Sequence, residues 1–366
     1  MSDLAAPHIL ALNAYEPGKP EAELRRELGI AQIVKLASNE NPYGPSPRAT
    51  DAVSGAALDL HRYPDPRGYE LRAALAAHHG VSADELCLGN GSNELIDLIC
   101  RVFASPAEHV VFGHPSFPCY RIGSVAQQLD YTAVPLREHV HWNVDDLIAA
   151  VRPETKLLFV SNPNNPTGSY IGEAELSRLL RSVPEQVLIV VDEAYVEYVA
   201  ASDFAAATTL RDQRERLAIL RTFSKAYGLA ALRVGYVLGR PGLVHDLNRL
   251  RAPFNVGTAG QVAARVALED QSHLRQAVAA TIRDRRALSA ALAALGLQVA
   301  PSEANFVLVD VGRPGRAVYE ALLREGVIVR PMAAPLDAMI RVTVGLPDEN
   351  KRFLAALQRV LKDRRA

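Results

Sequence analysis

The chain of 366 residues has little of several residue types that mark special classes of protein. It has only three cysteines, Cys87, Cys100 and Cys119, and no Cys-x-x-Cys pair, which argues against a disulfide framework and a zinc cluster. No apolar run approaches the roughly 18 to 20 residues that span a bilayer. The start, MSDLAAPHIL, lacks a basic stretch followed by an apolar core. We therefore expect no membrane partner, no metal site, and a soluble, unexported, cytoplasmic protein.

An excess of charge of one sign is also missing. The 40 basic and 41 acidic side chains give a formal net charge of -1, so there is no bulk electrostatic attraction for nucleic acid, and we expect no such partner. What the chain does have is an apolar fraction of 49% over 366 residues. That is enough for about two globular domains of roughly 150 residues each.

From residue 68 onward, segments with helical periodicity alternate with short β-branched segments, a pattern typical of an α/β protein built on a largely parallel sheet. Strands are expected at 86–88, 109–112, 130–134, 156–160, 187–191, 217–221 and 234–237. Helices are expected at 68–80, 92–103, 117–127, 145–151 and 173–182.

After about residue 250 the pattern predicts a second, smaller α+β domain that begins with a long helical stretch rich in alanine and arginine over 258–294. Strands near 297–300, 305–310, 327–330 and 340–344 and helices at 315–325 and 347–363 complete it. We expect an N-terminal arm (1–35), a large domain (36–252) and a small C-terminal domain (253–366).

In open parallel sheets, ligands bind beyond the carboxyl ends of the strands. Polar motifs follow four of the expected strands: GSNE at 91–94, SNPNNPTG at 161–168, DEAY at 192–195 and TFSK at 222–225. The first opens a helix whose free amides could hold a phosphate, although an ordinary strand-to-helix turn would look the same. The nicotinamide signature G-x-G-x-x-G is incomplete there, because Asn93 and Glu94 stand where its third glycine would fall.

Two of these motifs contain residues suited to chemistry. Asp192 directly follows the apolar run VLIVV, so its buried carboxylate needs a cationic partner, either a protonated ring nitrogen of a cofactor or an arginine. Tyr195 could reach the same ligand. Lysine is scarce at six residues, and Lys225 follows a buried strand with Arg233 eight residues on. An amine in that setting can be desolvated and activated for Schiff-base chemistry, whereas a surface lysine on a turn is the plain alternative.

Together, NPTG at 165–168, Asp192-x-x-Tyr195 and Ser224-Lys225 with Arg233 resemble the signature of fold-type I pyridoxal-phosphate aminotransferases. The resemblance extends over SNENPYGPSP (38–47), RYPDP (62–66), LGNGSNELI (88–96), VVDEAYVEY (190–198), RTFSKAYGLAALRVGY (221–236), EANFVLV (303–309) and IRVTVG (340–345). These stretches are similar to the histidinol-phosphate aminotransferase branch.

The resemblance implies a fold and an activity. The fold would have a large domain on a mostly parallel sheet and a smaller α+β domain. The activity would be transfer of an amino group from L-histidinol phosphate to 2-oxoglutarate, in histidine biosynthesis, by a homodimer that uses pyridoxal 5'-phosphate. An aromatic amino acid aminotransferase of the same branch is the alternative.

By position, the resemblance also implies roles for single residues. Lys225 would bind the cofactor as a Schiff base, Asp192 would keep its ring nitrogen protonated, and Tyr195 and Asn165 would hydrogen-bond its phenolic oxygen. The phosphate would be held by Thr222, Ser224, Arg233 and the amides of Gly91 and Ser92, while Phe117 would stack on the ring and Tyr63 would reach in from a second subunit. The substrate would be met by Tyr15 of the arm, Asn165, Arg330 and Arg341, because a planar guanidinium matches a carboxylate or phosphate with two parallel hydrogen bonds.

Some positions depart from the pattern of the branch. Ala231 stands where glycine is usual, and GTAG at 257–260 replaces a more polar run, but neither change removes a functional group. The apolar segment 332–339 beside the presumed substrate arginines leaves an aromatic donor open. A non-catalytic aminotransferase-like regulator is disfavoured by the intact lysine and by the lack of a DNA-binding extension before residue 35, and a nicotinamide oxidoreductase is disfavoured by the missing glycine.

Overall fold

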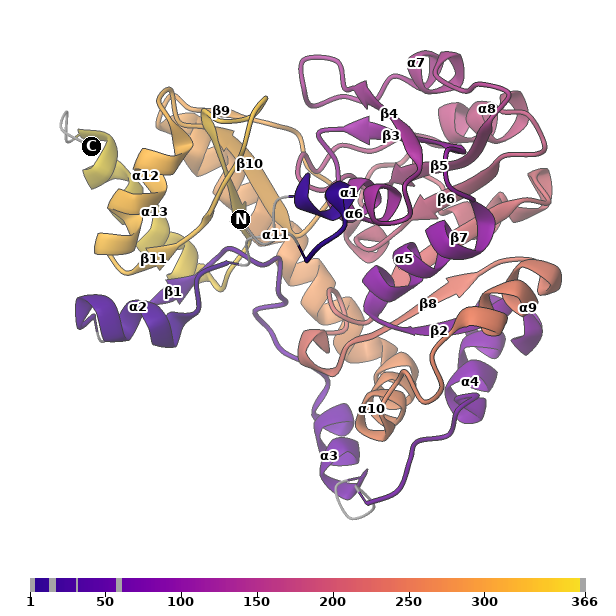
Figure 1. Cartoon of the computed structure of the whole chain (residues 1–366). Coiled ribbons are helices and arrows are strands. Elements are labelled where there is room, and N and C mark those ends of the chain that lie inside the picture. The colour runs from indigo at the N-terminus through magenta and orange to yellow at the C-terminus, as the bar shows by residue number, and fades with distance from the viewer. Residues whose placement is uncertain (1–3, 13–17, 31, 57–60, 363–366) are drawn as a thin grey trace.

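The structure is a computed structural model that describes residues 4–12, 18–30, 32–56 and 61–362 (Figure 1). Two sheets dominate it, a seven-stranded sheet built from the first two thirds of the chain and a four-stranded sheet built from the C-terminal part. No helix in the described ranges is long and apolar enough to cross a membrane.

The larger sheet has the strand order β2-β8-β7-β6-β5-β3-β4. Its strands are β2 (Leu86–Asn90), β3 (His109–His114), β4 (Asp130–Pro135), β5 (Thr155–Ser161), β6 (Leu188–Asp192), β7 (Leu217–Thr222) and β8 (Val234–Leu238). Only β8 runs antiparallel to its neighbours β2 and β7. The carboxyl ends of the other six strands therefore lie at one edge of the sheet, where ligands bind in folds of this kind.

Helices cover both faces of this sheet, which is why its central strands are apolar without alternation. In β6, Leu188 and Val190 face one core and Ile189 and Val191 face the other. The first core is covered by α5 (Gly91–Phe103), α6 (Cys119–Ala126) and α9 (Pro241–Leu250). The second is covered by α3 (Pro47–Ala56), α4 (Tyr69–His79), α7 (Val144–Ala149), α8 (Glu173–Ser182) and α10 (Thr258–Glu269).

The smaller sheet is antiparallel, with the order β12-β13-β10-β9. Its strands are β9 (Gln298–Val299), β10 (Phe306–Asp310), β12 (Arg330–Pro331) and β13 (Met339–Thr343), and α11 (Gln271–Ala294), α12 (Gly315–Arg324) and α13 (Pro347–Lys362) share a core with it. A short strand near the N-terminus, β1 (Val34–Lys35), pairs with β11 (Val327–Ile328) beside this sheet (Figure 1).

The expected fold class is confirmed, and every strand expected in the large sheet forms within two residues of its expected ends. The helical stretch expected over 258–294 is confirmed, and it consists of two helices, α10 and α11, with a break at Asp270. The Asp270 carboxylate accepts a hydrogen bond from the His273 amide and caps α11, and it also accepts one from the Ser46 hydroxyl at 2.6 Å. The sequence analysis also did not predict α3 and α9.

The first 35 residues contain α1 (Pro7–Leu10) and α2 (Glu21–Leu28), which the sequence analysis left without structure. Only Leu24 of α2 is buried, so the helix has almost no apolar face that periodicity could reveal. Short 3-10 turns lie at Ala83–Glu85, Val196–Tyr198, Ala207–Thr209, Arg211–Gln213 and Ala230–Leu232.

Candidate functional site

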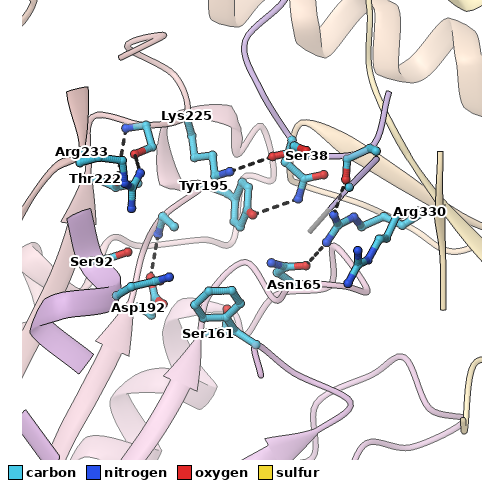
Figure 2. Close-up of a pocket in the computed structure, with 18 residues that line it drawn as sticks. Ser38, Ser92, Ser161, Asn165, Asp192, Tyr195, Thr222, Lys225, Arg233 and Arg330 are labelled. Carbon is cyan, nitrogen blue, oxygen red and sulfur yellow. Dashed lines mark hydrogen bonds between the residues drawn. The ribbon is translucent and has the colours of Figure 1, made fainter. Parts of the chain in front are cut away.

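The carboxyl ends of β2, β5, β6 and β7 open on one cavity of about 210 Å³. The strand ends contribute Ser92, Asn93, Ser161, Asn165, Asp192, Ala194, Tyr195, Thr222, Ser224, Lys225 and Arg233. Arg330 and Arg341 come from the smaller sheet, and Gly18, Ala37, Ser38 and Asn39 come from the N-terminal region. Figure 2 shows Arg233 and Arg330 at opposite ends, with Lys225 and Tyr195 between them. The site thus has one cationic end from the large sheet and one from the small sheet.

Asp192 ends β6 with its side chain in the cavity wall, and the residue is only 3% exposed. Its carboxylate accepts hydrogen bonds from the Tyr120 hydroxyl at 2.8 Å and from the Ala194 amide at 3.2 Å. Burial raises the pKa of Asp192 to about 6, while these two hydrogen bonds act to lower it. A buried carboxylate of this kind is stabilised in its charged form by a cationic ligand group placed against it.

Lys225 follows β7 and reaches the middle of the cavity. Its Nζ donates a hydrogen bond to the Ser38 carbonyl oxygen at 3.1 Å and lies 5.8 Å from the centre of the Tyr195 ring. Burial, with a further contribution from the positive charge of Arg341, lowers the pKa of Lys225 to about 8. A substantial fraction of the amine is therefore neutral near pH 8, the form that attacks a carbonyl carbon.

One end of the cavity is built to hold an anion. The Arg233 guanidinium donates to the Ser224 hydroxyl at 3.1 Å, and the Ser224 amide donates to the Thr222 hydroxyl at 3.0 Å. Gly91 begins α5 with φ +73°, and a Cβ at this position would overlap the Arg233 guanidinium. A helix N-terminus, two hydroxyls and a guanidinium together match the oxygens of a phosphate. Ser92, on the first turn of α5, lines the same end.

Tyr195 and Arg341 are held by hydrogen bonds with Asn165 and with the N-terminal region. The Asn39 amide donates to the Tyr195 hydroxyl at 3.0 Å. Arg341 donates to the Asn165 amide oxygen and, at 2.9 Å, to the Ala37 carbonyl oxygen. These contacts fix the phenol of Tyr195 and the guanidinium of Arg341 in the cavity wall.

The structure brings together every predicted site residue of this chain except two, with Gly91 in contact distance of the anion end and Phe117 in the cavity wall. Tyr63 does not line this cavity. It is 82% exposed and stacks on Phe254 with ring centres 4.6 Å apart, so a contribution to a second subunit stays a prediction. Tyr15 lies outside the described residues.

Several residues that shape the cavity were not predicted from the sequence, among them Ser38, Asn39 and Tyr120. Ser38 and Asn39 lie in the stretch SNENPYGPSP, which is part of the family resemblance, but no role was assigned to either residue. Tyr120 lies two residues beyond Pro118 in HPSFPCY, and its bond to Asp192 joins positions 72 apart. No local pattern marks a contact of that length.

Residues 31–357 match the family model described as aminotransferase class I and II. The chain belongs to this family. A histidinol-phosphate aminotransferase of Anaeromyxobacter sp. is 46% identical over 360 residues, with 98% of this chain and 99% of that protein covered. Histidinol-phosphate aminotransferase 2 of Pseudomonas aeruginosa is 45% identical, with 99% of each chain covered.

Solved structures of fold-type I aminotransferases have the same fold as this chain. The structure of histidinol-phosphate aminotransferase from Sinorhizobium meliloti in complex with pyridoxal-5'-phosphate aligns with a TM-score of 0.90 at 31% identity, and the alignment covers 99% of this chain and 98% of that one.

The aminotransferase cavity of this chain fits the chemistry of pyridoxal phosphate. The end around Arg233 suits the phosphate, because glycine at position 91 leaves room for the guanidinium beside the start of α5. The Lys225 amine suits an aldehyde, and the buried Asp192 carboxylate suits a protonated ring nitrogen.

Proposed function

We propose that this aminotransferase transfers the amino group of L-histidinol phosphate to 2-oxoglutarate, giving imidazole acetol phosphate and L-glutamate, a step of histidine biosynthesis. Relatives named for this activity that align over nearly their whole length support the proposal. The observation that carries it is the order of groups in the cavity, where Lys225 lies between the anion-binding end around Arg233 and the opposite end at Arg330 (Figure 2).

Pyridoxal phosphate, when bound, supplies an electron sink that stabilises negative charge at the α-carbon of an amino substrate. In our proposal, Ser92, Thr222, Ser224 and Arg233 bind its phosphate. Asp192 holds a proton on the ring nitrogen, and the bonds from Tyr120 and Ala194 keep that carboxylate oriented.

Tyr195 and Asn165 would orient the ring by hydrogen bonds to its phenolic oxygen, and Phe117 would pack on the ring face. Each of the three lines the cavity. The hydrogen bond that the Asn39 amide donates to the Tyr195 hydroxyl helps to hold the phenol in the cavity wall.

Lys225 is proposed to move the proton. A neutral Nζ can accept the proton that leaves the α-carbon of the donor and can later deliver it on the same face of the site. Burial, aided by the nearby Arg341, lowers the pKa of Lys225 to about 8, so the amine can both take up and release a proton near neutral pH.

Arg330 and Arg341 are proposed to bind the anionic groups of both substrates. The donor carries a phosphate, the acceptor carries two carboxylates, and an arginine fork can bind either with paired hydrogen bonds. The contacts of Arg341 with Asn165 and the Ala37 carbonyl hold its guanidinium at the cavity before substrate arrives. Tyr15 is proposed as a further substrate contact from the arm.

A cytoplasmic homodimer is part of the same proposal. The stacked, exposed pair Tyr63 and Phe254 supports it, because an aromatic surface of this kind is typical of an interface. In the dimer, Tyr63 would reach the cofactor phosphate of the second subunit.

The decisive experiment mixes the purified, cofactor-loaded protein with L-histidinol phosphate, L-glutamate and L-phenylalanine in separate runs and follows the visible absorption of the bound cofactor. The proposal expects a rapid loss of absorption with the first two donors and none in Lys225→Ala. Fast reaction with phenylalanine and little with histidinol phosphate would instead assign the chain to aromatic amino acids.

A further inference from the structure

Two charged side chains lie on the reverse face of the large sheet, directly behind the cavity. Successive residues of a strand point to opposite faces. Because Asp192 and Thr222 face the cavity, Glu193 and Arg221 face the core that α8 and α10 cover. Glu193 is 0% exposed and Arg221 is 8% exposed.

Glu193 and Arg221 form a buried ion pair that joins the ends of β6 and β7. One carboxylate oxygen of Glu193 accepts hydrogen bonds from Arg221 Nε at 2.8 Å and from its terminal nitrogen at 2.7 Å. The other oxygen accepts one from the Ala207 amide at 2.6 Å. The backbone is joined at the same place, since the Glu193 amide donates to the Leu220 carbonyl oxygen at 3.0 Å.

Burial of an ion pair adds little net stability, because desolvation of both groups opposes their attraction, and an apolar pair of similar volume serves packing as well or better. The charges of this pair have another consequence. Asp192 and Glu193 are adjacent carboxylates, and the negative charge of Glu193 acts against ionisation of Asp192. Arg221 is placed to neutralise the negative charge of Glu193, while Asp192 keeps its negative charge.

We propose that the Glu193–Arg221 ion pair is a positioning device for the cofactor ring: it fixes the end of β6 against the end of β7 and leaves the negative charge of Asp192 to face the ring nitrogen. The inference rests on the proposed function, because it assumes that a pyridine ring is bound against Asp192. Neither residue of the pair touches the cofactor, so both act through their sequence neighbours Asp192 and Thr222.

The test compares the cofactor-loaded protein with Glu193→Gln, Arg221→Gln and the double variant. Glu193→Gln preserves shape and leaves a guanidinium that cannot lose its proton, so the site gains positive charge. Arg221→Gln leaves the Glu193 carboxylate without its arginine, so the site gains negative charge. The double variant replaces the ion pair by two neutral amides and restores the net charge of the wild type.

We expect opposite shifts in the pH titration of the visible absorption of the bound cofactor. The midpoint should fall by about half a pH unit or more in Glu193→Gln, because added positive charge disfavours protonation, and should rise in Arg221→Gln. The double variant should titrate near the wild type. The dissociation constant for pyridoxal phosphate, measured by dialysis, should rise about tenfold in each single variant and about threefold or less in the double variant.

The matched control is Arg285→Gln. Arg285 is also buried and forms a 2.8 Å ion pair with Glu303, but that pair joins α11 to the residues before β10 and to the backbone of Tyr198 and Ala200, and it contacts no residue of β6 or β7. It should lower the unfolding midpoint of the protein without moving the titration or the affinity for the cofactor.

Other titratable groups surround the pair, and one requires its own control. The groups coupled electrostatically to Arg221 include Glu197, which also forms a 3.8 Å ion pair with it, and Tyr227, Tyr236, His78 and His79. Burial raises the pKa of Glu197 to about 7, so this carboxyl titrates in the range of the experiment. The comparison is therefore repeated with Glu197→Gln in every protein, and the opposite shifts should persist.

Shifts of the same sign in both single variants, or titration and affinity equal to those of the control, would overturn the proposal. If Arg221→Gln does not fold, Glu193→Gln and Arg221→Lys decide the question, and the lysine variant should stay close to wild type because it keeps the charge. A wild-type protein that binds pyridoxal phosphate but does not react with histidinol phosphate would refute the proposed function and leave this inference standing. A wild-type protein that never binds pyridoxal phosphate would refute both.

Discussion

The lowered pKa of Lys225 gives a quantitative prediction for the protein stripped of its cofactor. Burial, then the positive charge of Arg341, moves the pKa of this amine from 10.5 to about 8. At pH 7.5 about a quarter of the amine would then be neutral, against about one part in a thousand for an ordinary lysine. Covalent capture of pyridoxal phosphate should therefore be roughly 200-fold faster at that pH than an unperturbed amine allows.

The assay follows the growth of visible absorption after the stripped protein is mixed with excess pyridoxal phosphate between pH 6 and 10.5. A small alkylamine measured in parallel corrects for the titration of the aldehyde reagent itself. The rate constant should rise with pH to a midpoint near 8 and then level off, because protonation of Lys225 below its pKa removes the nucleophile. A rate that keeps rising through pH 10 would refute the reasoning.

The same assay can attribute the shift to its causes. The charged groups that act on the Lys225 amine are Arg341 and Arg233, which lower its pKa, and Glu40 and Asp192, which raise it. Arg341→Gln removes a positive charge, so the midpoint should move upward, toward 10.5. Arg178→Gln removes an equally charged side chain from the exposed surface of α8 and should leave the midpoint unchanged.

Three further predictions concern packing and assembly. Arg214 is 2% exposed and donates to the carbonyl oxygens of residues 180, 183, 184 and 187, so Arg214→Met should cost about 3 to 5 kcal/mol in urea unfolding, and a loss below about 1 kcal/mol would contradict this. Gly91→Ala should weaken cofactor binding in equilibrium dialysis at least about tenfold, because the added Cβ meets the Arg233 guanidinium, and unchanged affinity would show that the guanidinium lies elsewhere. Tyr63→Ala and Lys225→Ala proteins, each with little activity alone, should regain activity when their subunits are exchanged, because one site of the mixed dimer is then intact. No recovery after exchange confirmed by mass spectrometry would place Tyr63 in its own subunit.

The strands and their carboxyl ends could be predicted because each strand is an apolar run closed by a polar residue. Examples are VLIVV followed by Asp192 and LAILR followed by Thr222. Each pattern indicates both the strand and the strand end that lines the cavity. Lys225 could be singled out because lysine is scarce and this one follows a buried strand. In each case the information is local, and the parallel sheet brings the four motifs together without any further signal from the sequence.

Contacts between distant segments could not be predicted in the same way. The Tyr120 hydroxyl and Asp192 are 72 positions apart, and β1 pairs with a strand almost three hundred residues later. The break at Asp270 was missed for a different reason. An aspartate within a helical pattern is compatible with an exposed helix position, and only its bonds to Ser46 and to the His273 amide make it a cap.

The two adjacent acids in DEAY, Asp192 and Glu193, could have been assigned to opposite faces of the sheet from the sequence, because successive residues of a strand point to opposite faces. Asp192 follows a strand that is buried on both faces, so the next acid, Glu193, must leave the cavity and enter the opposite core. A carboxylate buried in that core requires a cationic partner. Arg221, which precedes Thr222 on the neighbouring strand β7, supplies it. Two consecutive carboxylates thus differ in surroundings for a geometric reason, since Asp192 faces the cavity and Glu193 faces the Arg221 guanidinium, and substitution of either one should alter the charge in the cavity.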